Sequence, residues 1–363
     1  MKHRVNSINK VGLVNSDGHV IGLDLGATAV RAAALAPGLH EGRPSVSVHG
    51  LGAVPLPPGS ITFGAVTNPG AVTAAIKQLW ATAKLKDTKV VLGIASQQVV
   101  VRDLTMPDMP AEQIRAALPF QARDVIALPL EQALIDFCPL GPAGPNGAGI
   151  PGLLIAMPRK PVITAVEAVE KAGLQVARVD LAAFAALRST AGDPGAVEMV
   201  VDIGAQLSTV VIHRAGAPKV VRIIAQGSDA VTEGLADRGS MPVEEAEAAK
   251  RPIGVGDGST GDSGIARIVR DLVRPLMSEV RGSAQFYNST NADAPIASIV
   301  LTGGGAAMPG LANSLAEQHG VPASVVTPMR HIRNRFFGQG GDTEGDENAA
   351  TAVSIGLAMG AAA

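Results

Sequence analysis

The chain has 363 residues, a formal net charge of −2, 47% hydrophobic residues and 17% charged residues. It is long enough to bury two cores, and its composition is that of a globular protein rather than a disordered one. Aromatic residues make up only 2%, so aliphatic side chains must fill the cores, and surfaces that stack on nucleic-acid bases are disfavoured. The near-neutral charge gives no general attraction to nucleic acid or to anionic lipid. We expect no nucleic-acid partner.

The cysteine count and the apolar segments bear on the compartment. Cys138 is the single cysteine, which excludes an internal disulfide and a cysteine-based zinc site. The basic residues in 1–10 are not followed by the apolar core of a signal peptide. The apolar segment 349–360 is shorter than the ~20 residues that cross a bilayer. We expect a cytoplasmic protein, which another protein would have to hold at any membrane.

Two strongly apolar segments each lead into a glycine-containing turn and then into a second strand. In the first, residues 20–31, Asp24 stands two places before Gly26; in the second, residues 199–208, Asp202 stands two places before Gly204. Both segments read as strand, turn and strand. The matching pair, about half a chain apart, predicts a duplicated nucleotide-binding lobe.

A third apolar strand, 299–301, runs into Thr302-Gly303-Gly304-Gly305, and Pro309-Gly310 then precedes a helix over 311–319. The segment between the two hairpins predicts strands at 90–94, 98–101, 134–140 and 152–157, and helices at 111–124 and 161–172. This order suits a small α/β subdomain inserted in the first lobe. Further helices are expected at 242–250 and 265–287, and a solvated acidic loop at 338–348.

An Asp-x-Gly sequence at the end of a buried strand has a physical use in nucleotide binding. The tight turn directs backbone N–H groups at phosphate oxygens, and glycine lets the chain approach closely. The aspartate can hold Mg²⁺ through water, because Mg²⁺ loses its hydration shell reluctantly. The chain has neither the GxxxxGK[ST] sequence of P-loop enzymes nor a GxGxxG that opens a helix after the first strand.

Several stretches in this order carry a family resemblance. They are 21–26, 106–110, 179–187, 243–250 and 299–311. The order Asp24-x-Gly26, Asp202-x-Gly204, Gly227, then Gly303-Gly304-Gly305 with Pro309-Gly310 resembles the phosphate and adenosine motifs of the actin, sugar-kinase and chaperone ATPase superfamily. Within it, the stretches resemble the PilM family of type IV pilus assembly proteins, which is similar to the cell-division protein FtsA. The resemblance covers residues 20–358.

The resemblance implies an α/β actin-like ATPase fold. Two lobes, each with a central mixed sheet, would enclose a nucleotide cleft. Lobe I would span 18–95, with 179–197 and 325–363 returning to it; the inserted subdomain would span 96–178, and lobe II 198–324 with a small subdomain at about 235–264.

The resemblance also implies roles for individual residues, with ATP and Mg²⁺ as cofactors. Asp24 and Asp202 would organise Mg²⁺ and its waters and are the catalytic candidates. The remaining candidate ATP-binding residues are Gly26, Ala27, Thr28, Arg31, Gly204, Ala205, Gln206, Gly227, Glu247, Lys250, Gly303, Gly304, Gly305 and Met308. Glu247 and Lys250 would face the ribose and adenine, or else form only a surface ion pair along their helix.

Two positions depart from the family pattern. Arg31 stands where PilM-like proteins tend to have lysine, and Gln206-Leu207 where short hydroxyl residues are usual. The departures bear on hydrolysis more than on binding, so at most slow ATP turnover is expected. Asp180 is open to two interpretations, a helix N-cap or a catalytic residue.

The resemblance implies an ATP-binding component of type IV pilus assembly that binds the cytoplasmic N-terminal peptide of a PilN-like bitopic inner-membrane protein. The candidate groove lies in 90–109 and 111–124. Contacts with other proteins of the inner-membrane platform and self-association would be possible. Two alternatives stay open: a sugar- or acetate-type kinase, which needs a further carboxylate as general base, and an FtsA-like filament-forming protein, which tends to end in a membrane-binding amphipathic helix.

Overall fold

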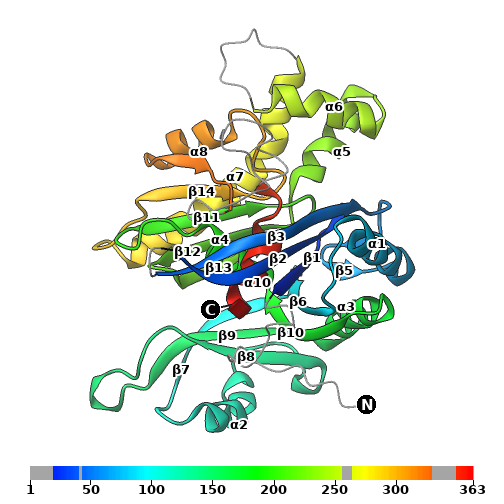
Figure 1. Ribbon diagram of the computed structural model, residues 1–363. Helices are drawn as coiled ribbons and strands as arrows, with labels where there is room; N and C mark the ends of the chain where they lie inside the picture. Colours follow the sequence, from blue (N-terminus) through cyan, green and yellow to red (C-terminus); the bar gives the residue numbers. More distant parts are fainter. Residues whose placement is uncertain (1–18, 41–42, 256–263, 329–348, 363) are drawn as a thin grey trace.

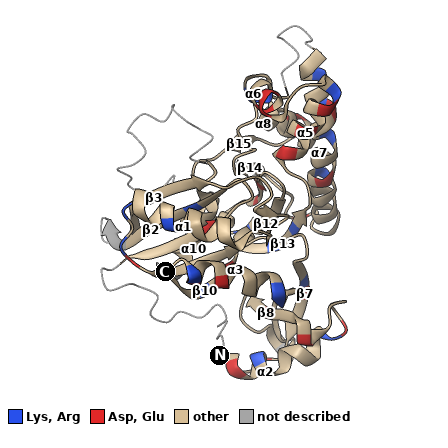
Figure 2. Cartoon of the chain, turned by 90° about the vertical axis from the view of Figure 1, so that its right-hand side faces the viewer, with Lys and Arg blue, Asp and Glu red and all other residues tan. Residues whose placement is uncertain are grey.

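The computed structural model describes residues 19–40, 43–255, 264–328 and 349–362. In these ranges the strands form two five-stranded sheets, one three-stranded sheet and one small hairpin (Figure 1). Charged side chains gather on the outer helices, while the sheets between them carry few (Figure 2). The acidic loop expected at 338–348 lies outside the described residues.

The first sheet has the order β3-β2-β1-β6-β10. Its strands are β1 (Val20–Leu25), β2 (Ala29–His40), β3 (Arg43–Pro55), β6 (Lys89–Ile94) and β10 (Gln175–Leu181). Helices α1 (Pro69–Thr82) and α3 (Arg159–Lys171) pack on one face through aliphatic side chains. Helices α4 (Ala182–Thr190) and α10 (Ala352–Ala362) cover the other face. The sheet is therefore buried on both sides.

The second sheet has the order β13-β12-β11-β14-β15. Its strands are β11 (Val197–Ile203), β12 (Ser208–Arg214), β13 (Ala217–Ile224), β14 (Ser298–Thr302) and β15 (Ala323–Val325). One face is covered by α5 (Ser228–Gly239), α6 (Val243–Ile253), α7 (Gly264–Thr290) and α8 (Leu311–His319). Phe184 and Leu187 of α4 pack on the other face.

The two sheets share one topology. In each, three strands run antiparallel as a meander, a fourth strand pairs in parallel with the first of them, and a fifth pairs in parallel with the fourth. This confirms the α/β fold with a mixed sheet in each lobe, which the resemblance implied, and the duplication that the paired Asp-x-Gly hairpins predicted.

The inserted part is a three-stranded antiparallel sheet of order β7-β9-β8. It consists of β7 (Val100–Met106), β8 (Ala133–Pro139) and β9 (Ile150–Pro158), with α2 (Ala111–Ala122) and the short helices η1 (Leu130–Gln132) and η2 (Pro145–Gly147). Leu118 and Ala122 of α2 pack on its strands in a core of their own.

The inserted subdomain ends earlier in the chain than the sequence suggested. The expected boundary was residue 178, but α3 packs in the first lobe's core and β10 pairs in parallel with β6. We place the end of the insertion after β9, near Pro158. A small hairpin, β4 (Ile61–Thr62) with β5 (Ala65–Val66), follows β3.

The C-terminal helix α10 lies at the centre of the molecule (Figure 1). Two glycines allow α10 to pack closely against β1 and α4. A Cβ at Gly22 of β1 would overlap the Ser354 carbonyl oxygen, and a Cβ at Gly356 would overlap the Ala185 carbonyl oxygen. The apolar tail thus joins β1 to α4. Among the described residues, no helix is long and apolar enough to span a membrane.

Candidate nucleotide site

The two hairpin turns are built alike. In the first, the Gly26 N–H donates to the Ala29 carbonyl at 3.1 Å; in the second, the Gly204 N–H donates to Leu207 at 2.9 Å. Asp24 pairs across the strands with Arg31, and Asp202 occupies the same register position opposite Thr209. Each turn therefore presents an aspartate, a glycine and short backbone segments at the same end of its sheet.

The two aspartates influence each other electrostatically. Both aspartates are partly accessible to solvent, yet protein atoms surround their carboxyl groups closely. Burial raises the pKa of Asp24 to about 6, while the Arg31 guanidinium lowers it. Burial also raises the pKa of Asp202 to about 7; the Asp24 carboxylate adds to the rise and Arg31 opposes it. Arg31 thus lies near both acids, and a further cation would stabilise their charged forms.

The donor set suits a hydrated Mg²⁺. Among the described residues, no group of three or more His, Cys, Asp or Glu side chains could hold a metal ion by itself. Two carboxylates without a third ligand match an ion that keeps several waters and takes its other ligands from phosphates. The raised pKa values of both acids also fit a place that a cation would occupy.

The start of α5 closes the second hairpin. The Ser228 and Asp229 N–H groups donate to the carbonyls of Gly204 and Ala205, at 2.9 and 2.8 Å. A Cβ at Gly227 would overlap these same carbonyl oxygens, so only glycine allows this approach. Gly227 therefore lies beside the second turn, and its contact with ATP stays a prediction.

The glycine turn after β14 packs on the same hairpin. Gly303 has φ +86°, and a Cβ there would overlap a carboxylate oxygen of Asp202. The Gly305 N–H donates to Ile203 at 2.8 Å, and Met308 follows in the same turn. Gly304 lies near Ala350. The adenosine candidates and the second phosphate turn are thus neighbours.

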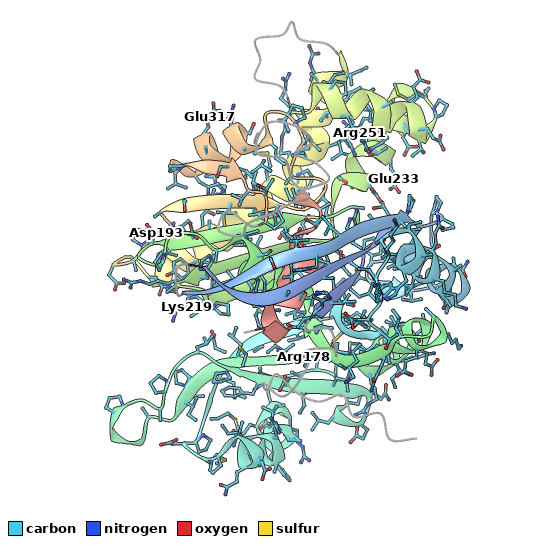
Figure 3. All side chains as sticks on the ribbon, in the orientation of Figure 1. Arg178, Asp193, Lys219, Glu233, Arg251 and Glu317 are labelled. Carbon is cyan, nitrogen blue, oxygen red and sulfur yellow. The ribbon has the colours of Figure 1, made fainter. Side chains whose placement is uncertain are left out.

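Glu247 and Lys250 form a partly buried network instead of a surface ion pair. Lys250 is only 5% exposed. Its Nζ lies 2.5 Å from Glu247 and donates to the Thr232 hydroxyl of α5 at 2.6 Å. Burial alone would raise the pKa of Glu247, but hydrogen bonds from Lys250 and Thr232 outweigh it and lower the pKa. Glu247 also accepts from Arg251, labelled in Figure 3. The ammonium group ties α6 to α5, and its proposed contact with adenine stays a prediction.

Gln206 reaches out of the site. Its Oε1 accepts a 2.8 Å hydrogen bond from the Phe63 N–H of the β4–β5 hairpin. Thr28, at the same place in the first turn, has an exposed side chain, and its carbonyl accepts from Leu56. The pattern around Asp202 gave no sign of the Phe63 contact, because its partner is 143 residues away.

Asp180 is not the N-cap of α4, which is Leu181. It lies next to the end of β10, pairs with Arg188 and accepts from the Leu181 N–H at 2.8 Å. Arg178, labelled in Figure 3, donates to the Gly360 carbonyl, and Arg188 donates to that of Gly356. This cluster fixes the far end of α10. Ser228 and Thr232 also lie beside the site, although the sequence motifs did not point to them. The only sign of them in the sequence is that a helix begins after Gly227.

Comparisons with known proteins agree with this architecture. A family model described as type IV pilus assembly protein PilM matches residues 22–362. A structure of the PilM-PilN type IV pilus biogenesis complex is 26% identical with TM-score 0.80, and the match covers 95% of this chain and 98% of that chain. Two more distant structures share the fold alone.

The first is the ethanolamine utilization protein EutJ from Carboxydothermus hydrogenoformans, which is 16% identical with TM-score 0.54, over 95% of this chain and 90% of that chain. The second is MreB 5 of Spiroplasma citri bound to AMPPNP, which is 12% identical with TM-score 0.52, over 94% of this chain and 95% of that chain. Because the family model matches nearly the whole sequence, this chain belongs to the PilM family of type IV pilus assembly proteins.

Proposed function

We propose that this protein binds Mg²⁺-ATP between its two lobes and docks the N-terminal cytoplasmic peptide of a PilN-like membrane protein during type IV pilus assembly. The observation that carries the proposal is the likeness, at TM-score 0.80 over 95% of the chain, to a PilM-PilN complex. The likeness to MreB 5 bound to AMPPNP supports the choice of nucleotide.

In the proposed complex, the two hairpin turns hold the phosphates from opposite sides. Backbone N–H groups of residues 27–28 and 205–206 are the candidate donors there, because those of Gly26 and Gly204 already close their own turns. Asp24 and Asp202 orient the waters around Mg²⁺, and the ion itself neutralises phosphate charge when bound. Arg31, beside both acids, offers a guanidinium to a phosphate oxygen. The turn at residues 303–305 borders the adenosine.

A surface cavity supports part of the expected peptide groove. Its volume is about 260 Å³, and Thr105, Met106, Pro107, Gln121 and residues 147–149 line it. These residues come from the end of β7, from α2 and from the loop before β9. The stretch 90–94, which was included in the groove, cannot contribute, because it forms β6 in the middle of the buried first sheet. The proposed groove is therefore the β7–α2 surface of the insertion.

A lysine placed in this groove should block the peptide. We expect Gln121→Lys and Thr105→Lys each to weaken binding of the partner's N-terminal peptide by about tenfold, since a new charge in an apolar contact must be desolvated. Both side chains are exposed, so the fold should survive. Fluorescence anisotropy of a labelled peptide measures the effect, with Gln285→Lys on the exposed face of α7 as the matched control. Equal affinity for all variants would place the peptide elsewhere.

Recruitment by the partner would place the protein at the cytoplasmic face of the inner membrane. We expect the protein to sediment with membranes when the PilN-like partner is present and to stay in the soluble fraction when the partner gene is deleted. Fractionation and immunoblotting measure this. Persistent membrane association in the deletion strain would reject the tether, and would favour the further proposed contacts with other platform proteins or with assembled copies of this chain.

A further inference from the structure

One hydrogen bond joins a phosphate turn of the second lobe to the first lobe. The Phe63 N–H, between β4 and β5, donates to the Gln206 side chain at 2.8 Å. Gln206 lies four residues after Asp202, where the first turn has Thr28 four residues after Asp24. A threonine hydroxyl stands much closer to its backbone than a glutamine amide does. The extra length of Gln206 is what lets a phosphate turn reach the opposite lobe.

The first-lobe partner of this bond is a strained turn. Phe63 has φ +46° and Gly64 has φ +82° in the two-residue loop between Thr62 and Ala65. A left-handed conformation is unfavourable for phenylalanine, whereas asparagine or glycine would accept it readily. Phe63 is also 37% exposed, so it does not belong to the buried core of its lobe. Backbone strain of this kind is found at functional turns.

The strained turn is fixed to its own lobe. A Cβ at Gly64 would overlap the Ala95 carbonyl oxygen, so the turn lies directly on the residue that follows β6. Ser60 adds two anchors, because its carbonyl accepts from the Thr67 and Asn68 N–H groups at 3.0 and 3.1 Å. The Phe63 N–H is therefore held in one orientation, toward the second lobe.

We propose that Gln206 and the Phe63–Gly64 turn form an interlobe latch that holds the two lobes closed over the nucleotide. The role in nucleotide retention rests on the proposed ATP site, whereas the latch itself does not. Gln206 Oε1 is occupied by Phe63, so only its Nε2 and its backbone N–H remain for phosphate. Opening the cleft requires this bond to break, and the latch therefore slows nucleotide release.

Hydrogen exchange in the nucleotide-free protein tests the latch directly. Gln206→Met keeps the length of the side chain but removes the acceptor, and we expect exchange of the 61–66 backbone amides to accelerate about two- to tenfold, the range for one net hydrogen bond. Gln206→Glu keeps an acceptor oxygen, so protection should persist. Gln285→Met, on the exposed face of α7, is the matched control. Unchanged exchange in Gln206→Met would overturn the proposal.

Nucleotide release gives the second readout. With a fluorescent ATP analogue and Mg²⁺, we expect dissociation from Gln206→Met to be about two- to tenfold faster than from the wild type, with no change in Gln285→Met. An unchanged dissociation rate would overturn the role of the latch in retention. A wild-type protein that binds no nucleotide would reject the ATP site instead, and the exchange experiment would still decide whether the latch exists.

Discussion

Asp24→Asn and Asp202→Asn should each weaken Mg²⁺-dependent ATP binding by about a hundredfold while making the nucleotide-free protein more stable at pH 7.5. The carboxylates are held close together in an enclosed site, and burial raises the pKa of both. A neutral amide keeps the shape but removes the charge that attracts the hydrated ion. Function and stability should therefore change in opposite directions, as expected where a site keeps an unfavourable charge for binding.

The gain in stability should depend on pH in a defined direction. Burial raises the pKa of Asp202 from its ordinary value of 3.8 to about 7 in the folded protein. As pH rises above about 4, the carboxyl ionises first in the unfolded chain, so the folded state loses relative stability until about pH 7. One pKa unit corresponds to about 1.36 kcal/mol, and partial exposure reduces the total, so we expect a gain of about 2 kcal/mol for Asp202→Asn at pH 7.5. The gain should shrink as pH falls toward 4.

Two measurements check this pair of effects. Isothermal titration calorimetry gives ATP affinity with and without Mg²⁺, and wild-type affinity should fall between pH 8 and pH 6 because protons compete for both acids. Urea unfolding at pH 7.5 and pH 5 gives the stability difference. Asp237→Asn on the exposed face of α5 is the control and should change neither quantity. If the two variants bind Mg²⁺-ATP as tightly as the wild type does, the two aspartates do not belong to the site.

The sequence predicted those features that local pattern determines. Each hairpin is an apolar strand, a glycine turn and a second strand. Neighbouring residues determine both the alternation of side chains along such strands and the conformation of the turn. The matching pair then predicted the duplicated lobe, and the structure brings the candidate residues Gly227 and 303–305 beside the second turn.

Features that depend on distant contacts were not visible in the sequence. Lys250 has the spacing of an exposed ion pair with Glu247, and only the packing of α6 against Thr232 of α5 reveals that its charge is buried. The expected boundary at residue 178 falls inside β10, because the pairing of this strand with β6 is decided by tertiary structure. The Gln206 contact with Phe63 likewise joins two loops far apart in sequence.

Gly356→Ala should destabilise the protein by about 3 kcal/mol, whereas Gly282→Ala should stabilise it by about 0.5–1 kcal/mol. Both glycines lie inside helices, α10 and α7, where alanine is intrinsically favoured. At Gly282 the nearest atom to a new Cβ is Arg222 Nη1 at 3.9 Å, so the helix preference should prevail. At Gly356 the Cβ would overlap the Ala185 carbonyl oxygen, and two backbones cannot give way as a flexible side chain can.

The Gly356→Ala substitution should also affect the nucleotide site. Moving α10 away from α4 breaks the 3.0 Å hydrogen bond from Arg188 Nε to the Gly356 carbonyl. The chain just before α10 is anchored at the glycine turn, where the Ala349 carbonyl accepts from the Gly303 N–H and the Thr302 hydroxyl. We therefore expect weaker ATP binding in Gly356→Ala and unchanged binding in Gly282→Ala. Urea unfolding and calorimetry measure the two effects, and a loss of under about 1 kcal/mol in Gly356→Ala would contradict the close seating of α10 on α4.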